Sequence, residues 1–486
     1  MSQPAPPGRA EPPAPSGLRV VVANWRDAGH PEAGGAEVYA EQMAQELSDR
    51  GHKVTFLSAA YVGADAGLPA RGRVEHLRSG GRWTVYPAVA WWLLRHRHDV
   101  DAVVDCQNGI PFFAPLWVRR RTAVVCVVHH IHTEQFGLHF PAPVAAVGRL
   151  LEGPFSRRVY GRRPAVAVSP STAQALRSRL RWRGPIHIVP NGAPASTDPR
   201  TRDRRALLPT VVSVGRLVVH KRVQLLVEAA AKLAAHRPGL TVEIIGSGPE
   251  LSDLRVLVET LGVGGVVSLP GRLDDEQVAA ALDRAWLSVA TTRGEGWGLS
   301  VLEAAARGLP TLAFEVEGVR DAVRPGRTGW LVDDGADLAA AMDVALDEVA
   351  EPSAAAELAT ACRDWAGEFT WANSGDRLEA VLMAEVRRCS SGRVDRREIV
   401  DEATLVELPA DHGHALATVT AGLRGTDRAG VWRSRIWFLL TGCPSSSVPG
   451  VLARLGVRPE SAVATRSASA EDLLRAEPLR GWTVPS

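Results

Sequence analysis

The stretch Glu295-Gly296-Trp297-Gly298-Leu299-Ser300-Val301-Leu302-Glu303 contains two carboxylates eight positions apart, separated by two glycines, a tryptophan and an apolar run. Three alanines and an arginine follow, and then Gly308 and Pro310, which is the pattern of a helix end. The segment predicts a glycine-rich loop leading into a short helix, with Glu295 before the helix and Glu303 about one turn inside it. Free N–H groups at a helix N-terminus favour a phosphate, and carboxylates accept hydrogen bonds from sugar hydroxyls. The arrangement therefore suits a ligand with a central diphosphate and hydroxyl-rich rings at both ends.

The composition is that of an ordinary globular protein, with 45 % hydrophobic and 23 % charged residues among 486. This length predicts two or three domains. A net charge of +2 gives no indication of a nucleic-acid partner. Only three residues are lysine, at positions 53, 221 and 232, so Arg fills most positions that merely need a positive charge. The five cysteines form no C-x-x-C pair, which favours reduced thiols and a cytoplasmic location.

The N-terminal residues 1–17 include six prolines and no apolar run. We expect a disordered tail there and not a signal peptide. No apolar stretch approaches the 18 or so residues of a membrane-spanning helix, so none is expected.

The remaining chain alternates apolar strand-like runs with amphipathic helical segments, which predicts parallel sheets with right-handed crossovers. Residues 18–200 form a first such half, 201–369 a second, and the pattern restarts after a linker at 191–208 that is rich in Pro, Asp and Arg. The expected fold is α/β, with two Rossmann-like doubly wound domains facing a cleft. A closing helix is expected over 370–389, and 390–486 reads as an extra small C-terminal region of unknown role.

Several segments, taken in order, resemble the family 4 retaining glycosyltransferases, which have the GT-B fold. The matching pieces cover roughly residues 18–385 and are Gly34-Gly35-Ala36-Glu37, Val189-Pro190-Asn191-Gly192, Gly215-Arg216-Leu217 with Lys221, Gly246-Ser247-Gly248-Pro249, Gly271-Arg272-Leu273 and the glutamate pair. The stretch from His129 to Phe136 also resembles bacterial members. Ser300 departs from the pattern, because many members carry Pro or a β-branched residue there.

The resemblance implies a transferase that moves a sugar from a UDP- or GDP-linked donor to a hydroxyl acceptor such as a glycan, a lipid-linked saccharide or a small metabolite. Arg216 and Lys221 follow a strand and precede a helix, where two cations can neutralise a leaving diphosphate. The alternative for these two residues is a solvated basic loop. The resemblance assigns them to the donor diphosphate, so we treat both as catalytic.

The other donor-site assignments also come from the resemblance. It places Glu303 on the ribose and Glu295 on hydroxyls of the donor sugar, and it places the Gly34-Gly35 loop against the diphosphate. The backbone around the glutamate pair would cradle sugar and phosphate, and a turn after a strand would read the base edge. The residues assigned to these two segments are Gly296, Trp297, Gly298, Leu299 and Ser300 for the cradle, and Gly271, Arg272 and Leu273 for the turn. The side chain of Trp297 is expected to pack as a wall or in the core.

Three histidines, at 129, 130 and 132, follow an apolar strand. They lack the carboxylate or cysteine partners of a usual metal set, so no metal ligand is assigned. By resemblance, one of them contacts the donor sugar near the reacting carbon. His129 is favoured by position, His130 is the alternative, and a purely structural histidine stays open.

The resemblance further implies retention of configuration, with front-face attack while a phosphate oxygen of the leaving group takes the acceptor proton. No divalent metal or other cofactor is then required. A phosphorylase, a nucleotide-sugar epimerase and a non-catalytic nucleotide-sugar-binding module are the alternatives.

Residues 83–94, WTVYPAVAWWLL, are aromatic and apolar and are followed by Arg95, His96, Arg97 and His98. This segment reads either as a core helix with a solvated end or as a basic amphipathic surface. The second reading predicts peripheral contact with the inner face of a membrane. A His pair at 412 and 414 is more simply incidental than a metal site.

Overall fold

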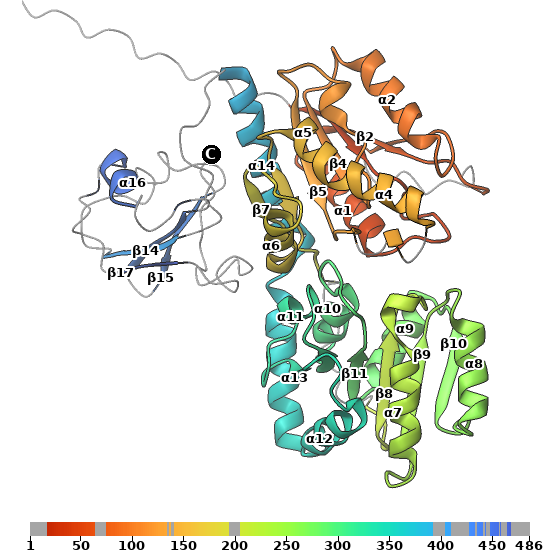
Figure 1. Cartoon of the computed structure of the whole chain (residues 1–486). Helices are drawn as coiled ribbons and strands as arrows, with labels where there is room; N and C mark the ends of the chain where they lie inside the picture. Colours follow the sequence, from red (N-terminus) through yellow and green to blue (C-terminus); the bar gives the residue numbers. More distant parts are fainter. Residues whose placement is uncertain are drawn as a thin grey trace, which may run out of the picture.

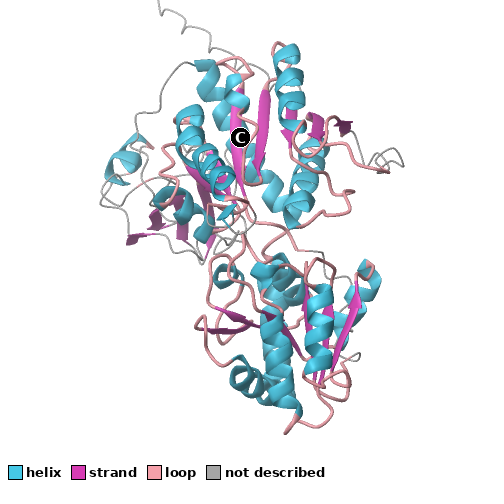
Figure 2. Ribbon diagram, turned by 45° about the vertical axis from the view of Figure 1, so that its right-hand side comes forward, coloured by secondary structure: helices cyan, strands magenta, loops and turns pink. Residues whose placement is uncertain are grey.

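The computed structural model of the chain describes residues 17–63, 74–133, 136–137, 140–193, 205–391, 404–409, 427–432, 435–440, 443, 448–455, 457 and 464–467. Two large α/β domains follow one another in the chain and a smaller antiparallel sheet comes last (Figures 1 and 2). Residues 1–16 of the tail, most of the linker and the His412–His414 segment lie outside the described residues.

The first domain is built on a seven-stranded parallel sheet in the order β3-β2-β1-β4-β5-β6-β7. Its central strands are mostly apolar and buried on both faces, as parallel strands between helical layers require, although they include the buried polar residues Thr55, Asp105 and Gln107. Val20 and Val22 belong to one core cluster and Val21 to another, so both faces are covered. The strands are β1 (Arg19–Ala23), β2 (Lys53–Ser58), β3 (Glu75–Arg78), β4 (Ala102–Gln107), β5 (Ala123–Val128), β6 (Ala165–Ala167) and β7 (Ile186–Ile188).

The helices of this domain are α1 (Gly35–Asp49), α2 (Val85–His96), α4 (Ala142–Leu150), α5 (Ser156–Tyr160) and α6 (Pro170–Ser178). A π-helical turn at Leu151–Phe155, with Pro154 inside it, joins α4 to α5.

The second domain repeats the plan in a six-stranded parallel sheet of order β10-β9-β8-β11-β12-β13. Val211 and Val212 point to different core clusters, so this sheet too is covered on both faces. Its strands are β8 (Thr210–Val214), β9 (Thr241–Ile245), β10 (Val267–Gly271), β11 (Leu287–Ala290), β12 (Thr311–Phe314) and β13 (Gly329–Val332). Its helices are α7 (Gln224–Ala234), α8 (Leu251–Thr260), α9 (Asp275–Arg284), α10 (Leu299–Ala306), α11 (Val319–Ala322), α12 (Leu338–Ala350) and α13 (Pro352–Gly367).

Both sheets therefore have the Rossmann strand order. Successive strands are first added on one side of the first strand and then on its other side. In the first domain this switch point lies between β1 and β4, and in the second it lies between β8 and β11. Ligands of such sheets bind outside the carboxyl ends of the strands at the switch point. The fold is thus the GT-B arrangement that the sequence predicts.

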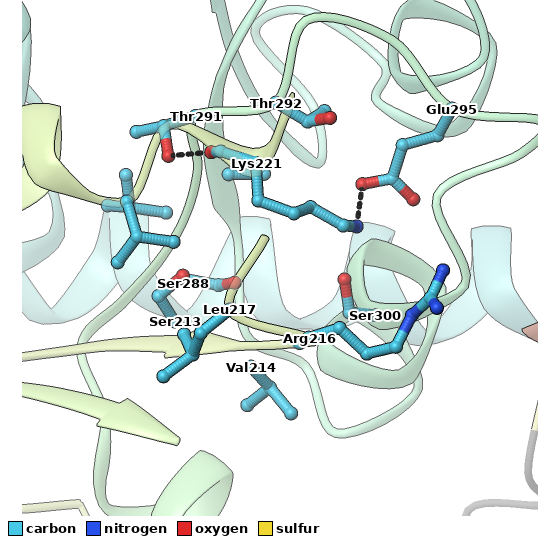
Figure 3. A pocket seen from close by; sticks show the side chains of 14 residues that line it. Ser213, Val214, Arg216, Leu217, Lys221, Ser288, Thr291, Thr292, Glu295 and Ser300 are labelled. Carbon is cyan, nitrogen blue, oxygen red and sulfur yellow. Dashed lines mark hydrogen bonds and ion pairs between the residues drawn. The ribbon is translucent and has the colours of Figure 1, made fainter. Parts of the chain in front are cut away.

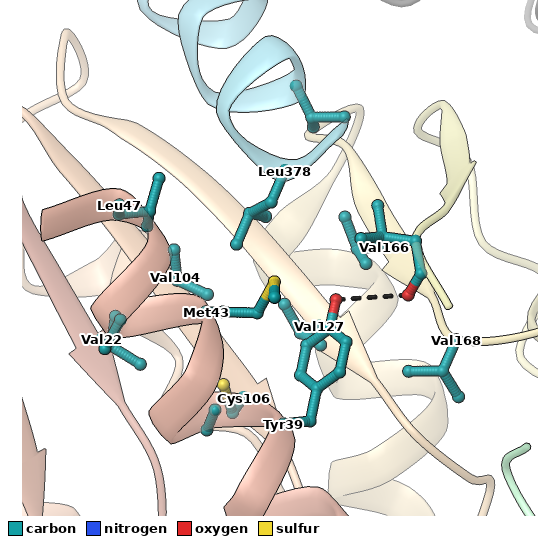
Figure 4. Packing of buried hydrophobic residues seen from close by; sticks show 14 of the residues in the cluster. Val22, Tyr39, Met43, Leu47, Val104, Cys106, Val127, Val166, Val168 and Leu378 are labelled. Carbon is teal, nitrogen blue, oxygen red and sulfur yellow. Dashed lines mark hydrogen bonds between the residues drawn. The ribbon is translucent and has the colours of Figure 1, made fainter. Parts of the chain in front are cut away.

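The last long helix, α14 (Trp371–Ser391), returns to the first domain and packs against α1 and β5. Figure 4 shows Leu378 of α14 facing Met43 and Leu47 of α1 inside one apolar cluster. Polar contacts fix the same position, because Arg50 Nη2 lies 2.6 Å from a carboxylate oxygen of Asp376. The helix expected over 370–389 is therefore a structural part of the first domain.

Strands β14 (Thr404–Pro409), β15 (Arg428–Trp432), β16 (Arg435–Leu440) and β17 (Ala464–Ser467) form an antiparallel sheet in the order β15-β16-β14-β17. Helix α16 (Val448–Arg454) shares its apolar cluster, which includes Phe438 and Leu452. The extra C-terminal region thus contains a small core of its own.

Candidate active site

The two switch points line one interdomain cavity of about 1250 Å³. Sites for a single small molecule typically measure roughly 300–1,000 Å³, so this volume has room for two substrates. The first domain contributes loops that follow β1, β4 and β5, and the second contributes loops that follow β8 and β11. We use "interdomain cavity" for this space below.

Lys221 and Glu295 form an ion pair on the second-domain wall, with Nζ 2.5 Å from Oε1 (Figure 3). The backbone that carries Lys221 is fixed from both sides. The Thr291 hydroxyl donates to the Lys221 carbonyl at 2.7 Å, and Arg222, in the left-handed conformation at φ +50°, donates to the carbonyls of Thr291 and Thr292 at 2.9 and 3.0 Å. The backbone on either side of Lys221 is thus bonded to Thr291 and Thr292, which follow β11.

Arg216 reaches across toward the glycine loop of the first domain. A Cβ built on Gly34 would lie 3.6 Å from Arg216 Nε, and one on Gly35 would lie 3.5 Å from Leu299 Cδ2. Both glycines therefore bring backbone close to the opposite domain, and the assignment of this loop to the donor diphosphate stays a prediction. The Gly34 N–H donates to the Glu37 carboxylate at 2.8 Å, within a capping box at the start of α1. That N–H is engaged within the protein.

Sequence reasoning missed the partner that holds this loop. Arg26 is nearly buried, and its Nε lies 3.2 Å from Glu37 Oε1 while its Nη1 lies 2.8 Å from Glu32 Oε2. The signal was present, because Glu37 completes the Gly-Gly-Ala-Glu motif. Arg26, its partner on the loop after β1, belongs to no motif that would identify it from the sequence.

Helix α10 presents its N-terminus to the interdomain cavity. Gly298 caps it at φ +88°, a conformation open to glycine, and Gly298, Leu299 and Ser300 all line the cavity. Glu303 lines the same cavity one turn further along. Burial raises the pKa of Glu303 to about 7, and the charge of Asp275 adds to the effect. Desolvation thus disfavours the charged form of Glu303 at this position.

Trp297 packs away from the ligand space. Its side chain is 2 % exposed and meets Phe369 edge-on with ring centroids 5.0 Å apart. Only its backbone is available to a donor, in agreement with the expected wall or core role.

Gly296 lies directly against the other domain. A Cβ at this position would fall 2.2 Å from the carbonyl oxygen of His129, a distance that no side chain tolerates. The Thr172 hydroxyl spans the same junction, at 3.2 Å from the His129 carbonyl and 3.3 Å from that of Gly296.

We therefore expect Gly296→Ala to lower kcat/KM about 100-fold, because the added methyl forces the two walls apart and a displacement of about 1 Å at a catalytic site can cost that much. Gly294→Ala is the matched control, since a Cβ there meets nothing closer than 3.9 Å. Steady-state kinetics on both variants measures the difference. Equal activities would show that the contact does not set the site geometry.

His129 and His130 both line the interdomain cavity. His129 packs edge-on against Tyr39 with ring centroids 4.9 Å apart. Burial lowers the pKa of each ring to about 3, and the nearby His132 contributes to both shifts. Both imidazoles are therefore neutral at pH 7 and offer hydrogen bonds without charge.

The Gly271-Arg272-Leu273 turn is not among the described residues that line the cavity. It begins at Gly271, the last residue of β10, at the edge of the second sheet, and Arg272 Nη1 donates to the Pro31 carbonyl across the domains at 3.2 Å. Its assignment to the base edge stays a prediction. Within the described residues, no group of three or more His, Cys, Asp or Glu side chains is placed to hold a metal ion.

Two family descriptions match the two domains. "Glycosyltransferase Family 4" matches residues 33–196, and "Glycosyl transferases group 1" matches residues 200–361. The chain therefore belongs to the family 4 glycosyltransferases, and it is a glycosyltransferase.

Individual relatives have related names. The chain is 28 % identical over 397 residues to the GDP-mannose-dependent alpha-(1-6)-phosphatidylinositol monomannoside mannosyltransferase of Mycolicibacterium smegmatis, covering 76 % of this chain and 97 % of that one. It is 30 % identical over 407 residues to the D-inositol 3-phosphate glycosyltransferase of Rhodococcus erythropolis, covering 74 % and 89 %. A sucrose-phosphate synthase from Thermosynechococcus elongatus shares the fold, with a TM-score of 0.62 at 21 % identity over 77 % of this chain and 99 % of that one.

Proposed function

We propose that this glycosyltransferase moves a sugar from a nucleoside-diphosphate sugar to an acceptor hydroxyl, with retention of configuration and without a metal. The observation that supports it best is the second-domain wall, where Arg216, the Lys221–Glu295 pair and the α10 N-terminus line one cavity. Cations and a helix N-terminus together suit a leaving diphosphate.

Each residue has a role in this proposal. Lys221 and Arg216 stabilise the negative charge that develops on the departing phosphate. Glu303 accepts hydrogen bonds from the ribose hydroxyls, and Glu295 accepts them from the donor sugar while it orients Lys221. A carboxylate already paired with an ammonium at 2.5 Å is better suited to binding than to nucleophilic attack.

The acceptor hydroxyl attacks the anomeric carbon of the donor sugar from the same face from which the leaving group departs. A phosphate oxygen of the diphosphate takes its proton, so the protein needs no separate base for this step. His129 and His130, both neutral, can donate hydrogen bonds to the sugar without placing a charge beside the electron-poor anomeric carbon. Arg216 and Lys221 supply the positive charge that a divalent ion would otherwise bring.

The donor is proposed to be UDP- or GDP-linked, and GDP-mannose is a natural first candidate because the M. smegmatis relative is named for it. We further propose that the protein works in the cytoplasm, where nucleotide sugars with any of these bases would reach it.

A thermal-shift screen with UDP-, GDP-, ADP- and dTDP-sugars tests the donor. A ligand at 100 times its Kd stabilises the folded state by about 2.7 kcal/mol, so one base should raise the melting temperature by several degrees. Transfer from that donor, with 1 mM EDTA present, should then give a product whose anomeric configuration by NMR matches the donor.

An inverted product would refute retention, and loss of turnover in EDTA would refute the metal-free proposal. Release of sugar phosphate on adding inorganic phosphate would indicate a phosphorylase. Donor binding without turnover across a broad acceptor panel would indicate a binding module.

A further inference from the structure

We propose that the acceptor is a membrane lipid, whose apolar part lies on the first-domain wall of the interdomain cavity while its hydroxyl-bearing head reaches the transfer site. The inference rests on the proposed function and adds the class of acceptor. We call this wall the apolar groove, lined by Trp83, Tyr86, Trp91 and Leu94 on or next to α2 and by Val144 and Val147 on α4.

The apolar groove contrasts with the opposite wall of the same cavity. The second-domain wall carries Arg216, Lys221 and Glu295, whereas the groove is made of aromatic and aliphatic side chains. A free sugar or inositol acceptor needs hydrogen-bonding partners for its hydroxyls. Aromatic rings alone could stack on a sugar face, but Val144 and Val147 offer only apolar contact. The groove residues and the proposed transfer site line the same cavity, so an occupant of the groove lies next to the reacting groups.

The apolar surface continues beyond the cavity into solvent. Trp91 is 64 % exposed, Val147 54 %, Leu150 55 % and Phe155 39 %. Exposed apolar patches of this kind mark interaction sites. Helix α2 explains how the patch arises, because Val85, Val89 and Leu93 are buried on one face and leave the other apolar side chains outside.

Charge on the same segments favours a bilayer as the source of the acceptor. Exposed arginines lie beside the apolar residues on each segment: Arg95 in the last turn of α2, Arg97 directly after it, Arg149 on α4 and Arg158 on α5. Between residues 81 and 98 there is no acidic residue, and the carboxylate of Asp99, which comes next, is paired with Arg19 at 3.2 Å. Between 140 and 163 there is only Glu152, which is buried. Apolar side chains edged with arginine and without exposed carboxylates match the surface of an anionic bilayer. A soluble apolar acceptor would need no such charge.

The test uses the full chain with vesicles of phosphatidylcholine and phosphatidylglycerol at 7:3, and with phosphatidylcholine alone. Wild-type protein should sediment with the anionic vesicles, and salt should weaken this. Val147→Asp should weaken the partitioning at least tenfold. Val256→Asp is the matched control, because Val256 is also an exposed helical valine, 61 % exposed on α8 of the second domain.

A second arm follows the product of a radiolabelled donor chosen by the thermal-shift screen, given membranes as acceptor source. Label should enter the organic phase on extraction, with a tenfold higher KM for the membrane acceptor in Val147→Asp. The inference would be overturned if wild-type protein stayed in the supernatant, or if vesicle binding fell equally in the two variants. It would also be overturned if the transfer reaction proceeded but label entered only water-soluble product. Failure of every donor to bind would instead refute the proposed function.

Discussion

Replacing Lys221 with alanine should lower kcat/KM on the natural donor by about 100- to 1000-fold, the usual effect of removing one group that stabilises developing negative charge. The ammonium lies 2.5 Å from Glu295 Oε1, so the variant loses a cation and also leaves Glu295 without that partner. An uncompensated carboxylate would then repel the diphosphate. The loss should appear in kcat as well as KM, because charge on the leaving group is greatest in the transition state.

Lys232→Ala is the matched control for this experiment, since Lys232 is an exposed lysine of α7 whose ammonium lies 3.3 Å from Asp337. It should keep activity within about twofold, as exposed ion pairs contribute little. Near-normal turnover by Lys221→Ala would contradict the assigned role. Equal losses in both variants would indicate a general effect on folding.

Glu303→Gln should have opposite effects on stability and on donor binding. Burial raises the pKa of Glu303 to about 7 from an ordinary 4.5, so the folded protein holds this proton more tightly than the unfolded chain. The contribution of this group to the free energy of unfolding therefore falls as pH rises from about 4.5 to about 7. The neutral amide avoids that loss. At pH 8 the variant should be more stable than wild type by about 1–3 kcal/mol, and near pH 4.5 the difference should vanish.

The same substitution should weaken donor binding at least tenfold, because hydrogen bonds to a charged acceptor are worth more than those to an amide. Melting temperatures from pH 4.5 to 8, with and without donor, measure both effects. Glu259→Gln, at an exposed position of α8, is the control and should change neither. A Glu303→Gln protein that binds donor normally would remove Glu303 from the ribose site.

The segment from Glu295 to Glu303 shows which features of the site can be predicted from the sequence. Two glycines and a helix stop were enough to predict a loop leading into a helix, and α10 begins at Leu299 with Glu303 one turn inside it. Such local signals depend on neighbours in the chain. The approach of Gly296 to His129 depends on how two domains dock, and no spacing in the sequence encodes it.

Edge elements show a similar limit in the fold. The sequence predicts the buried central strands, but β3, with sequence EHLR, lies at the sheet edge and is half exposed, so it lacks the apolar run that identifies a strand. The sequence of residues 83–94 is compatible with a core helix or with a surface helix. In the structure one face of the helix is buried, at Leu93, and the other is exposed, at Trp91.

The return of α14 has a consequence for the order in which the protein is made. During synthesis the ribosome releases β1 to β7 first, yet the apolar face that α14 covers, around Met43 and Leu47, stays open until residues near 380 emerge. The second domain, contiguous from about 205 to 367, is released in between and has its own core. We expect the domain that is translated first to mature last, and a chaperone that shields apolar surface would be needed most during that interval.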